Sequence, residues 1–245
     1  MSFKFWMVGA LSATLALAAQ ASTPNTNTTI YGDNFGTGSS YSTTFLNGVT
    51  ANFVAKVGGN DANFSFKPGQ GGFQGVGVSP KRGSERTPGE IDIGESITGS
   101  FSAGIKITSF TLGLLFDGGE YHDVNEVAKV KAFYEGRWHS FTLKATGTTL
   151  ALWSGVGATI TNLSAAADGL GGVWNVANPF GDKLVSKLVF TAIEGDAARG
   201  CRNCTNQSDY TLISVSAVPE PETYALLLAG LGAVGMAARR RKQQR

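Results

Sequence analysis

The chain has few residues of the types that usually carry chemistry. It contains two cysteines and two histidines among 245 residues, and only 16% of its residues are charged. One cysteine pair cannot complete a four-ligand zinc site, and the sequence has no second pair. His122 and His139 are the only candidates for a base that titrates near neutral pH. A binding or structural role is therefore the first expectation.

Regular patterns are also scarce. The chain has no strong internal repeat, which argues against a β-helix and against a flat, repetitive ice-binding face. The pairs Thr43-Thr44 and Thr148-Thr149 are too isolated to build such a face. No long amphipathic helix occurs between the two ends of the chain, so a helical bundle is not expected.

The body of the chain has no excess of basic residues. The whole chain carries 20 lysines and arginines against 18 aspartates and glutamates. Six of the basic and two of the acidic residues lie in the two terminal segments, which leaves 14 basic and 16 acidic residues in residues 22–217. The body therefore has a net charge of −2, and nucleic-acid binding, which needs a basic stripe, is not expected.

What the chain does contain is typical of a β protein. Glycine is abundant, with 33 residues, and short runs rich in β-branched and aromatic residues alternate with turn signals. The pattern predicts an all-β, antiparallel β-sandwich, jelly-roll-like, flanked by an N-terminal signal helix and a C-terminal hydrophobic helix. The expected strands are Phe45–Val57, Phe64–Phe66, Phe73–Val78, Ile97–Phe101, Ile105–Phe116, Val127–Tyr134, Trp138–Ala145, Thr149–Trp153, Lys183–Ile193 and Tyr210–Val218. We expect a turn at Glu135-Gly136-Arg137 and a short helical turn with a glycine loop over Ala165–Gly172.

The first 21 residues have the features of a signal peptide. Lys4 supplies a positive charge, Met7–Ala19 is apolar, and Ala19-Gln20-Ala21 is a small-residue cleavage site. We expect residues 1–21 to be removed and the body, residues 22–217, to begin near Ser22. An uncleaved first helix is the alternative.

The last 28 residues, 218–245, combine three features in order. Pro219 and Pro221 lack a backbone N–H and interrupt regular structure, so the segment around Glu220 should be an extended peptide. The apolar run Tyr224–Ala238 follows, and it would span roughly 22 Å as a helix. A basic anchor that should stay cytoplasmic comes next. Its residues are Arg239, Arg240 and Arg241.

Together the three features resemble the PEP-CTERM sorting signal of Gram-negative bacteria that make exopolysaccharide. The resemblance covers about the C-terminal tenth of the chain. It implies recognition by an exosortase, transit through the inner membrane, removal of the helix, and delivery to the cell surface or extracellular matrix. Exosortase and signal peptidase are then the processing partners, and contact with the membrane is transient. A single-pass anchor that is never cut is the alternative.

A second pattern, over roughly residues 75–135, resembles sandwich domains of other exosortase-sorted surface proteins. It consists of Gly75-Val76-Gly77-Val78, then Gly89-Glu90-Ile91-Asp92, then Glu95-Ser96-Ile97. The resemblance supports a sandwich and implies no known activity.

The two cysteines, Cys201 and Cys204, lie in a polar segment of a chain expected outside the cytoplasm. An oxidising compartment favours a local disulfide between them. A redox role, which the same spacing suggests in cytosolic proteins, is the alternative.

Acidic residues gather in two segments, and the expected cofactor is either none or a structural calcium ion. Calcium takes six to eight oxygen ligands, which loop carboxylates supply. The candidate ligands are Glu90, Asp92, Glu95, Asp117 and Asp123. Solvated loop charges and hydrogen bonds at strand ends are the alternative. The acidic pairs also suggest glycoside hydrolysis, for which two carboxyl groups must flank the scissile bond.

Aromatic side chains are the last hint of function. Tyr134, Trp138, Trp153 and Trp174 are candidates for stacking on sugar rings, and core packing is the alternative for each.

From these patterns we predict an exported, non-enzymatic surface or extracellular-matrix protein associated with exopolysaccharide or biofilm. A carbohydrate-binding, lectin-like module is the second hypothesis, and a secreted glycan-active enzyme is the third.

Overall fold

The computed structural model describes residues 28–45, 48–68, 72–118, 124–164, 172–197, 208–218, 229–232, 234 and 239. Almost all of the regular structure in these residues is β-strand. The elements are β1 (Thr29–Tyr31), η1 (Gly32–Phe35, a 3-10 helix), β2 (Ser40–Phe45), β3 (Val49–Val57), β4 (Asn60–Asp61), β5 (Asn63–Lys67), β6 (Gly75–Ser79), β7 (Glu95–Leu115), β8 (Val124–Tyr134), β9 (Arg137–Ala145), β10 (Ala151–Trp153), β11 (Thr159–Asn162), β12 (Gly172–Ala177), β13 (Leu184–Ala197) and β14 (Thr211–Val218).

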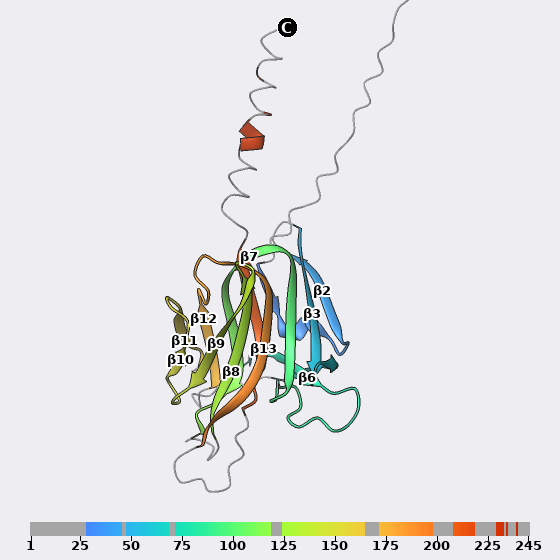
Figure 1. The fold of residues 1–245 in the computed structure, drawn as a ribbon, viewed down its shortest axis with the longest axis vertical. Coiled ribbons are helices and arrows are strands. Elements are labelled where there is room, and N and C mark those ends of the chain that lie inside the picture. The colour runs from blue at the N-terminus through green and yellow to red at the C-terminus, as the bar shows by residue number, and fades with distance from the viewer. Residues whose placement is uncertain are drawn as a thin grey trace, which may run out of the picture.

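The strands form two layers that share β7 (Figure 1). Antiparallel pairing gives the first layer the order β10-β9-β8-β13-β7-β3-β2. In the second layer the order is β11-β12-β7-β14, and β14 pairs in turn with β1 and with β6, which carries β5.

The long strand β7 crosses from one layer to the other. Its first part, residues 95–101, pairs with β3, and its later part, residues 106–113, pairs with β14. Opposite β13, Val185 faces Ile105 but Lys187 already faces Ser100, so the four residues 101–104 of β7 stand opposite the single residue Ser186. Such an insertion bends a strand, and β7 arches over the upper end of the sandwich in Figure 1.

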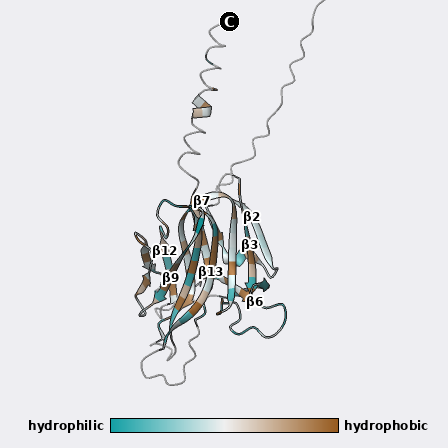
Figure 2. Cartoon of the chain, viewed as in Figure 1, coloured by the Kyte–Doolittle hydropathy of each residue, from teal (hydrophilic) through white to brown (hydrophobic). Residues whose placement is uncertain are grey.

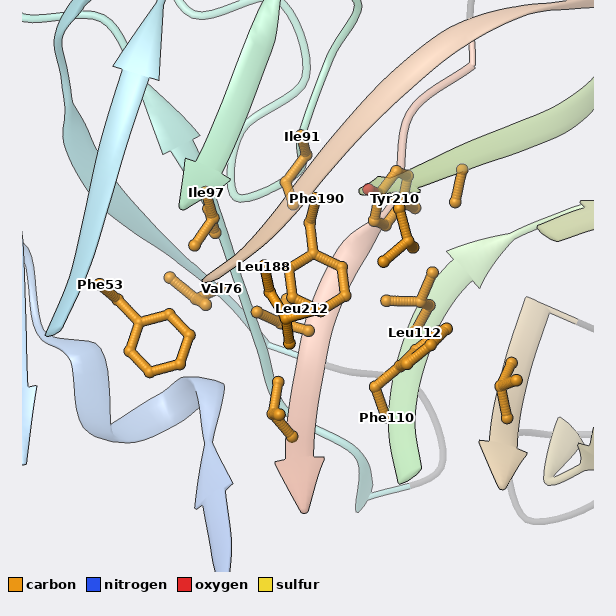
Figure 3. Packing of buried hydrophobic residues seen from close by; sticks show 14 of the residues in the cluster. Phe53, Val76, Ile91, Ile97, Phe110, Leu112, Leu188, Phe190, Tyr210 and Leu212 are labelled. Carbon is orange, nitrogen blue, oxygen red and sulfur yellow. The ribbon is translucent and has the colours of Figure 1, made fainter. Parts of the chain in front are cut away.

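The core fills the space between the layers. Phe110 of β7 lies edge-on to Phe190 of β13, with ring centroids 5.7 Å apart, and both side chains are fully buried. Leu188 and Leu212 come from opposite layers and meet in the same cluster (Figure 3). Burial of side chains of this size is the main stabilising term of the fold.

The predicted all-β, antiparallel sandwich is confirmed, with local corrections. The expected strand Phe45–Val57 begins only at Val49, as β3, because Phe45 is the last residue of β2. Ile97–Phe101 and Ile105–Phe116 are parts of the one strand β7. Of the expected helical turn and glycine loop, residues 165–171 lie outside the described residues, and Gly172 is the first residue of β12. The sequence did not predict β12, nor did it predict β2 and β11. The predicted flanking helices lie largely outside the described residues. Within the part of the chain that the structure describes, no helix combines the length and apolar composition that a membrane span requires.

Candidate functional site

The hairpin β8–β9 has an inner apolar face and an outer face of mixed chemistry. Ala128, Val130 and Ala132 point inward and are fully buried. Side chains alternate along a strand, so Lys129, Lys131 and Phe133 lie on the outer face together with Trp138, Ser140 and Thr142, their partners on β9. Figure 2 shows the resulting change between hydrophilic and hydrophobic residues along the strands of this layer.

A tight turn fixes the register of this hairpin. Glu135 and Gly136 connect the strands with φ values of 51° and 75°. Two successive residues with positive φ are typical of a type I′ turn, which matches the twist of a β-hairpin. The turn places Phe133 directly opposite Trp138.

The register extends this pair into a row across six strands of the first layer. The row runs from β2 through β3, β7, β13 and β8 to β9, and each member is at least partly exposed. We call it the Trp138 row, and its members are Ser42, Asn52, Ser100, Lys187, Phe133 and Trp138. Because neighbouring strands lie about 4.8 Å apart, it is roughly 24 Å long.

A second row runs beside the first on the same face. It contains Ser40, Val54, Thr98, Val189, Lys131 and Ser140. Its hydroxyl groups and those of the Trp138 row can both donate and accept hydrogen bonds. The outer face of the first layer is therefore broad and polar, with an aromatic group at one border.

Trp138 is held in place although it is exposed. The side chain is 42% exposed. Its ring packs edge-on against Phe133 with centroids 5.3 Å apart, and Lys131 Nζ lies 5.1 Å from its ring centroid. A cation at this distance from a tryptophan ring is attracted to it. Trp138 thus offers an oriented, accessible aromatic surface.

Three lysines on this face have no acidic partner among the described residues. Of the six other lysines that the structure describes, five form ion pairs, whereas Lys129, Lys131 and Lys187 form none. They occupy neighbouring positions of β8 and β13, since Lys187 pairs with Phe133 and Lys131 with Val189. No pattern in the sequence distinguishes these three lysines from the others.

The other aromatic candidates are used in packing. Trp174 is 1% exposed and donates through Nε1 to the carbonyl of Leu115 at 2.8 Å. Trp153 packs among Phe110, Phe141 and Phe180. These positions make core packing the role of both tryptophans.

Tyr134 and His139 belong to the inner side of the β8–β9 hairpin. Their rings stack in parallel with centroids 3.8 Å apart, and both side chains are half-buried. His139 Nε2 is buried and has no hydrogen-bond partner among the residues that the structure describes. His122, the other candidate base, lies outside the described residues.

The predicted acidic ligands Glu90, Asp92 and Glu95 lie near one another where β7 begins, and Glu95 is its first residue. Asp92 accepts hydrogen bonds from the backbone N–H and the hydroxyl of Thr87, and Glu95 accepts one from the backbone N–H of Asp92. Glu90 pairs with Lys67 at 2.6 Å and hydrogen-bonds with Asp209. These bonds fix the segment that leads into β7.

Burial changes the charge state of this group. Burial and the neighbouring Asp209 raise the pKa of Glu90 to about 8, against the opposing effect of Lys67. Burial likewise raises the pKa of Glu95 to about 7, and it raises the pKa of Asp92 above its ordinary value. Glu90 therefore holds its proton near neutral pH, and Glu95 titrates close to it.

The fourth predicted ligand is part of a separate contact. Asp117 accepts a hydrogen bond of 2.7 Å from Asn125 Nδ2, beyond the other end of β7. Asp123 lies outside the described residues. Within the described ranges, no three histidine, cysteine or acidic side chains are arranged to hold a metal ion. The calcium site stays a prediction.

Other predicted residues fall largely outside the described parts of the chain. They are Cys201, Cys204, Pro219, Glu220, Pro221, Arg240 and Arg241. Arg239 is described and is exposed.

Comparison with known proteins identifies the C-terminal segment alone. Residues 217–242 match the PEP-CTERM protein-sorting motif, as the order of proline, apolar and basic segments predicted. No curated protein and no solved structure matches the chain.

Proposed function

We propose that this protein, which its PEP-CTERM motif marks for exosortase processing and export to the cell surface or extracellular space, is a non-enzymatic matrix protein. In this proposal it binds exopolysaccharide outside a Gram-negative cell through the outer face of its first layer. The observation that carries the proposal is the Trp138 row, an exposed tryptophan at the border of a polar surface about 24 Å long.

The chemistry of the row suits a sugar polymer. The face of a tryptophan ring packs against the apolar face of a sugar, and hydroxyl and amide groups bond to sugar hydroxyls. Ser42 and Asn52 already bond to one another at 2.9 Å, which shows that polar side chains of adjacent strands reach each other along the row.

The row favours an extended polymer over a short, defined glycan. Its members come from six neighbouring strands, so a ligand that contacts all of them must lie across the layer. A lectin-like module for a small soluble glycan is the second hypothesis. A glycan-active enzyme is the third hypothesis. The carboxyl groups of Glu90, Asp92 and Glu95 already bond to backbone N–H groups or to neighbouring side chains, which leaves them poorly placed to act on a sugar.

Replacing Trp138 with alanine should weaken binding to exopolysaccharide by roughly five- to tenfold, because the stacking surface is lost. The measurement is co-sedimentation of the purified full chain with exopolysaccharide from the producing cells. Tyr31→Ala is the matched control, since Tyr31 is an aromatic residue of β1 in the second layer and is 50% exposed.

Equal binding by the Trp138→Ala variant and the unmodified protein would remove the proposed binding face. Assaying the same samples for new reducing ends tests the non-enzymatic part, and steady product release would contradict it.

Replacing Pro219-Glu220-Pro221 by three alanines should stop tail removal, because the motif presents this segment to the exosortase. The protein should then accumulate in the membrane fraction with residues 239–245 still attached, as intact mass spectrometry of each fraction can show. Thr223→Ala, in the same segment but outside the triplet, serves as the control. Normal processing of the triple variant would exclude recognition through Pro-Glu-Pro.

A further inference from the structure

We infer that the polymer bound on this face is polyanionic, and that Lys129, Lys131 and Lys187 neutralise its charged groups. This inference rests on the proposed function and adds the chemical class of the ligand. Three observations support it: the three lysines lie together, none has an acidic partner among the described residues, and they stand beside the exposed Trp138.

The cluster does not reflect a generally basic protein. The body carries more acidic than basic residues, with 16 against 14 in residues 22–217. Elsewhere on the same layer, Lys56 pairs with Asp61 and Lys144 with Asp196. Around the aromatic end of this face, by contrast, the three lysines have no ion-paired counterion among the described residues.

Protection of a sheet edge does not explain these lysines either. Lysine on an edge strand prevents pairing with other chains, but β8 lies between β9 and β13, and β13 lies between β8 and β7. Lysine is disfavoured inside sheets, and neighbouring like charges repel each other. An anionic ligand would offset that repulsion.

Lysine suits a polymer whose charges have no fixed geometry. Its ammonium group acts as a point charge on a flexible stem, whereas arginine favours a planar, two-pronged match to one carboxylate or phosphate. Lys129 and Lys131 are two residues apart on one strand, and Lys187 lies on the next. Carboxylates and sulfates are anions that acidic polysaccharides present at intervals along a chain, and they are the charged groups we expect in the ligand.

The test uses a triple variant of the full chain, Lys129→Gln, Lys131→Gln and Lys187→Gln. Retardation in gels that contain polygalacturonate or dextran sulfate measures binding. Methyl-esterified polygalacturonate and unmodified dextran supply the same backbones without charge. We expect the unmodified protein to bind at least one of the two charged polymers. It should bind both neutral polymers much more weakly. The triple variant should bind the charged polymer roughly tenfold or more weakly.

A matched control removes equal charge from another site. Lys81→Gln, Arg82→Gln and Arg86→Gln alter exposed residues between β6 and β7, and this variant should bind as the unmodified protein does. Binding of the unmodified protein should also weaken steeply with added salt, because salt screens exposed charges. This second measurement needs no variant and stands even if the triple variant fails to fold.

The outcomes separate the inference from the proposed function. Binding to polygalacturonate alone assigns carboxylates, and binding to dextran sulfate alone assigns sulfates. Equal binding to charged and neutral polymers, salt-independent binding, or unchanged binding by a folded triple variant would overturn the inference. If Trp138→Ala still weakened binding to native exopolysaccharide in that case, the proposed function would survive. If neither variant changed binding, both would fail.

Discussion

The Gly77→Ala variant should lose about 3 kcal/mol or more of its free energy of unfolding. A Cβ atom at Gly77 would lie 2.2 Å from both the backbone N and the backbone O of Glu90. Backbone atoms cannot rotate away as a side chain can, so the segment around Glu90 would have to move off β6. Ile91, which is fully buried, would then lose its packing.

This close approach also holds the acidic group in position. The backbone N–H of Val78 donates to the carbonyl of Glu90 at 2.8 Å, and that of Ile91 donates to the carbonyl of Tyr210 at 2.6 Å. The Glu90 segment is thus bonded to β6 and to the residue that precedes β14, and a methyl group at Gly77 disturbs both contacts.

Chemical denaturation of Gly77→Ala beside Gly147→Ala measures the effect. Gly147 has no positive φ and no atom within 4 Å of an added Cβ, so its substitution should change stability by less than about 1 kcal/mol. Equal stability of the two variants would mean that the Glu90 segment does not lie on β6 as the structure places it.

The sequence predicted strands well where apolar and polar residues alternate. Val127–Tyr134 and Trp138–Ala145 correspond closely to β8 and β9, and the intervening turn was expected. β12 was missed because it is buried on both sides, with Trp174 in the main core and Val173 in a second cluster with Ile213. Such a strand lacks the alternation that identifies half-buried strands.

The candidate site was only partly visible in the sequence. The expected hairpin turn implies that Phe133 and Trp138 face each other, since the turn fixes the register. The position of Lys187 beside this pair depends on the pairing of β8 with β13, and these strands lie about 50 residues apart in the sequence. The contact of Glu90 with Asp209 likewise joins segments far apart in the chain. No local pattern encodes such pairings.

The second large effect is a loss of stability as pH rises. Between about pH 4.5 and pH 8, folded Glu90 keeps its proton while the unfolded chain releases it, because burial raises the pKa of Glu90 to about 8. The folded state then binds more protons, so the free energy of unfolding falls with rising pH. Glu95, whose pKa burial raises to about 7, acts in the same direction. We expect a fall of about 2–4 kcal/mol from pH 5 to pH 9.

Two single variants identify the group responsible. The Glu90→Gln variant has no group that titrates at this position, so its free energy of unfolding should fall much less between pH 5 and pH 9. Near pH 9 it should be more stable than the unmodified protein. Glu135 is exposed, and its ion pair with Lys183 lowers its pKa, so Glu135→Gln should leave the slope unchanged. Denaturant titrations at a series of pH values measure all three proteins. A free energy of unfolding that rises with pH over this window would instead show that Lys67 keeps Glu90 ionised, because the ion pair would then outweigh the cost of burial.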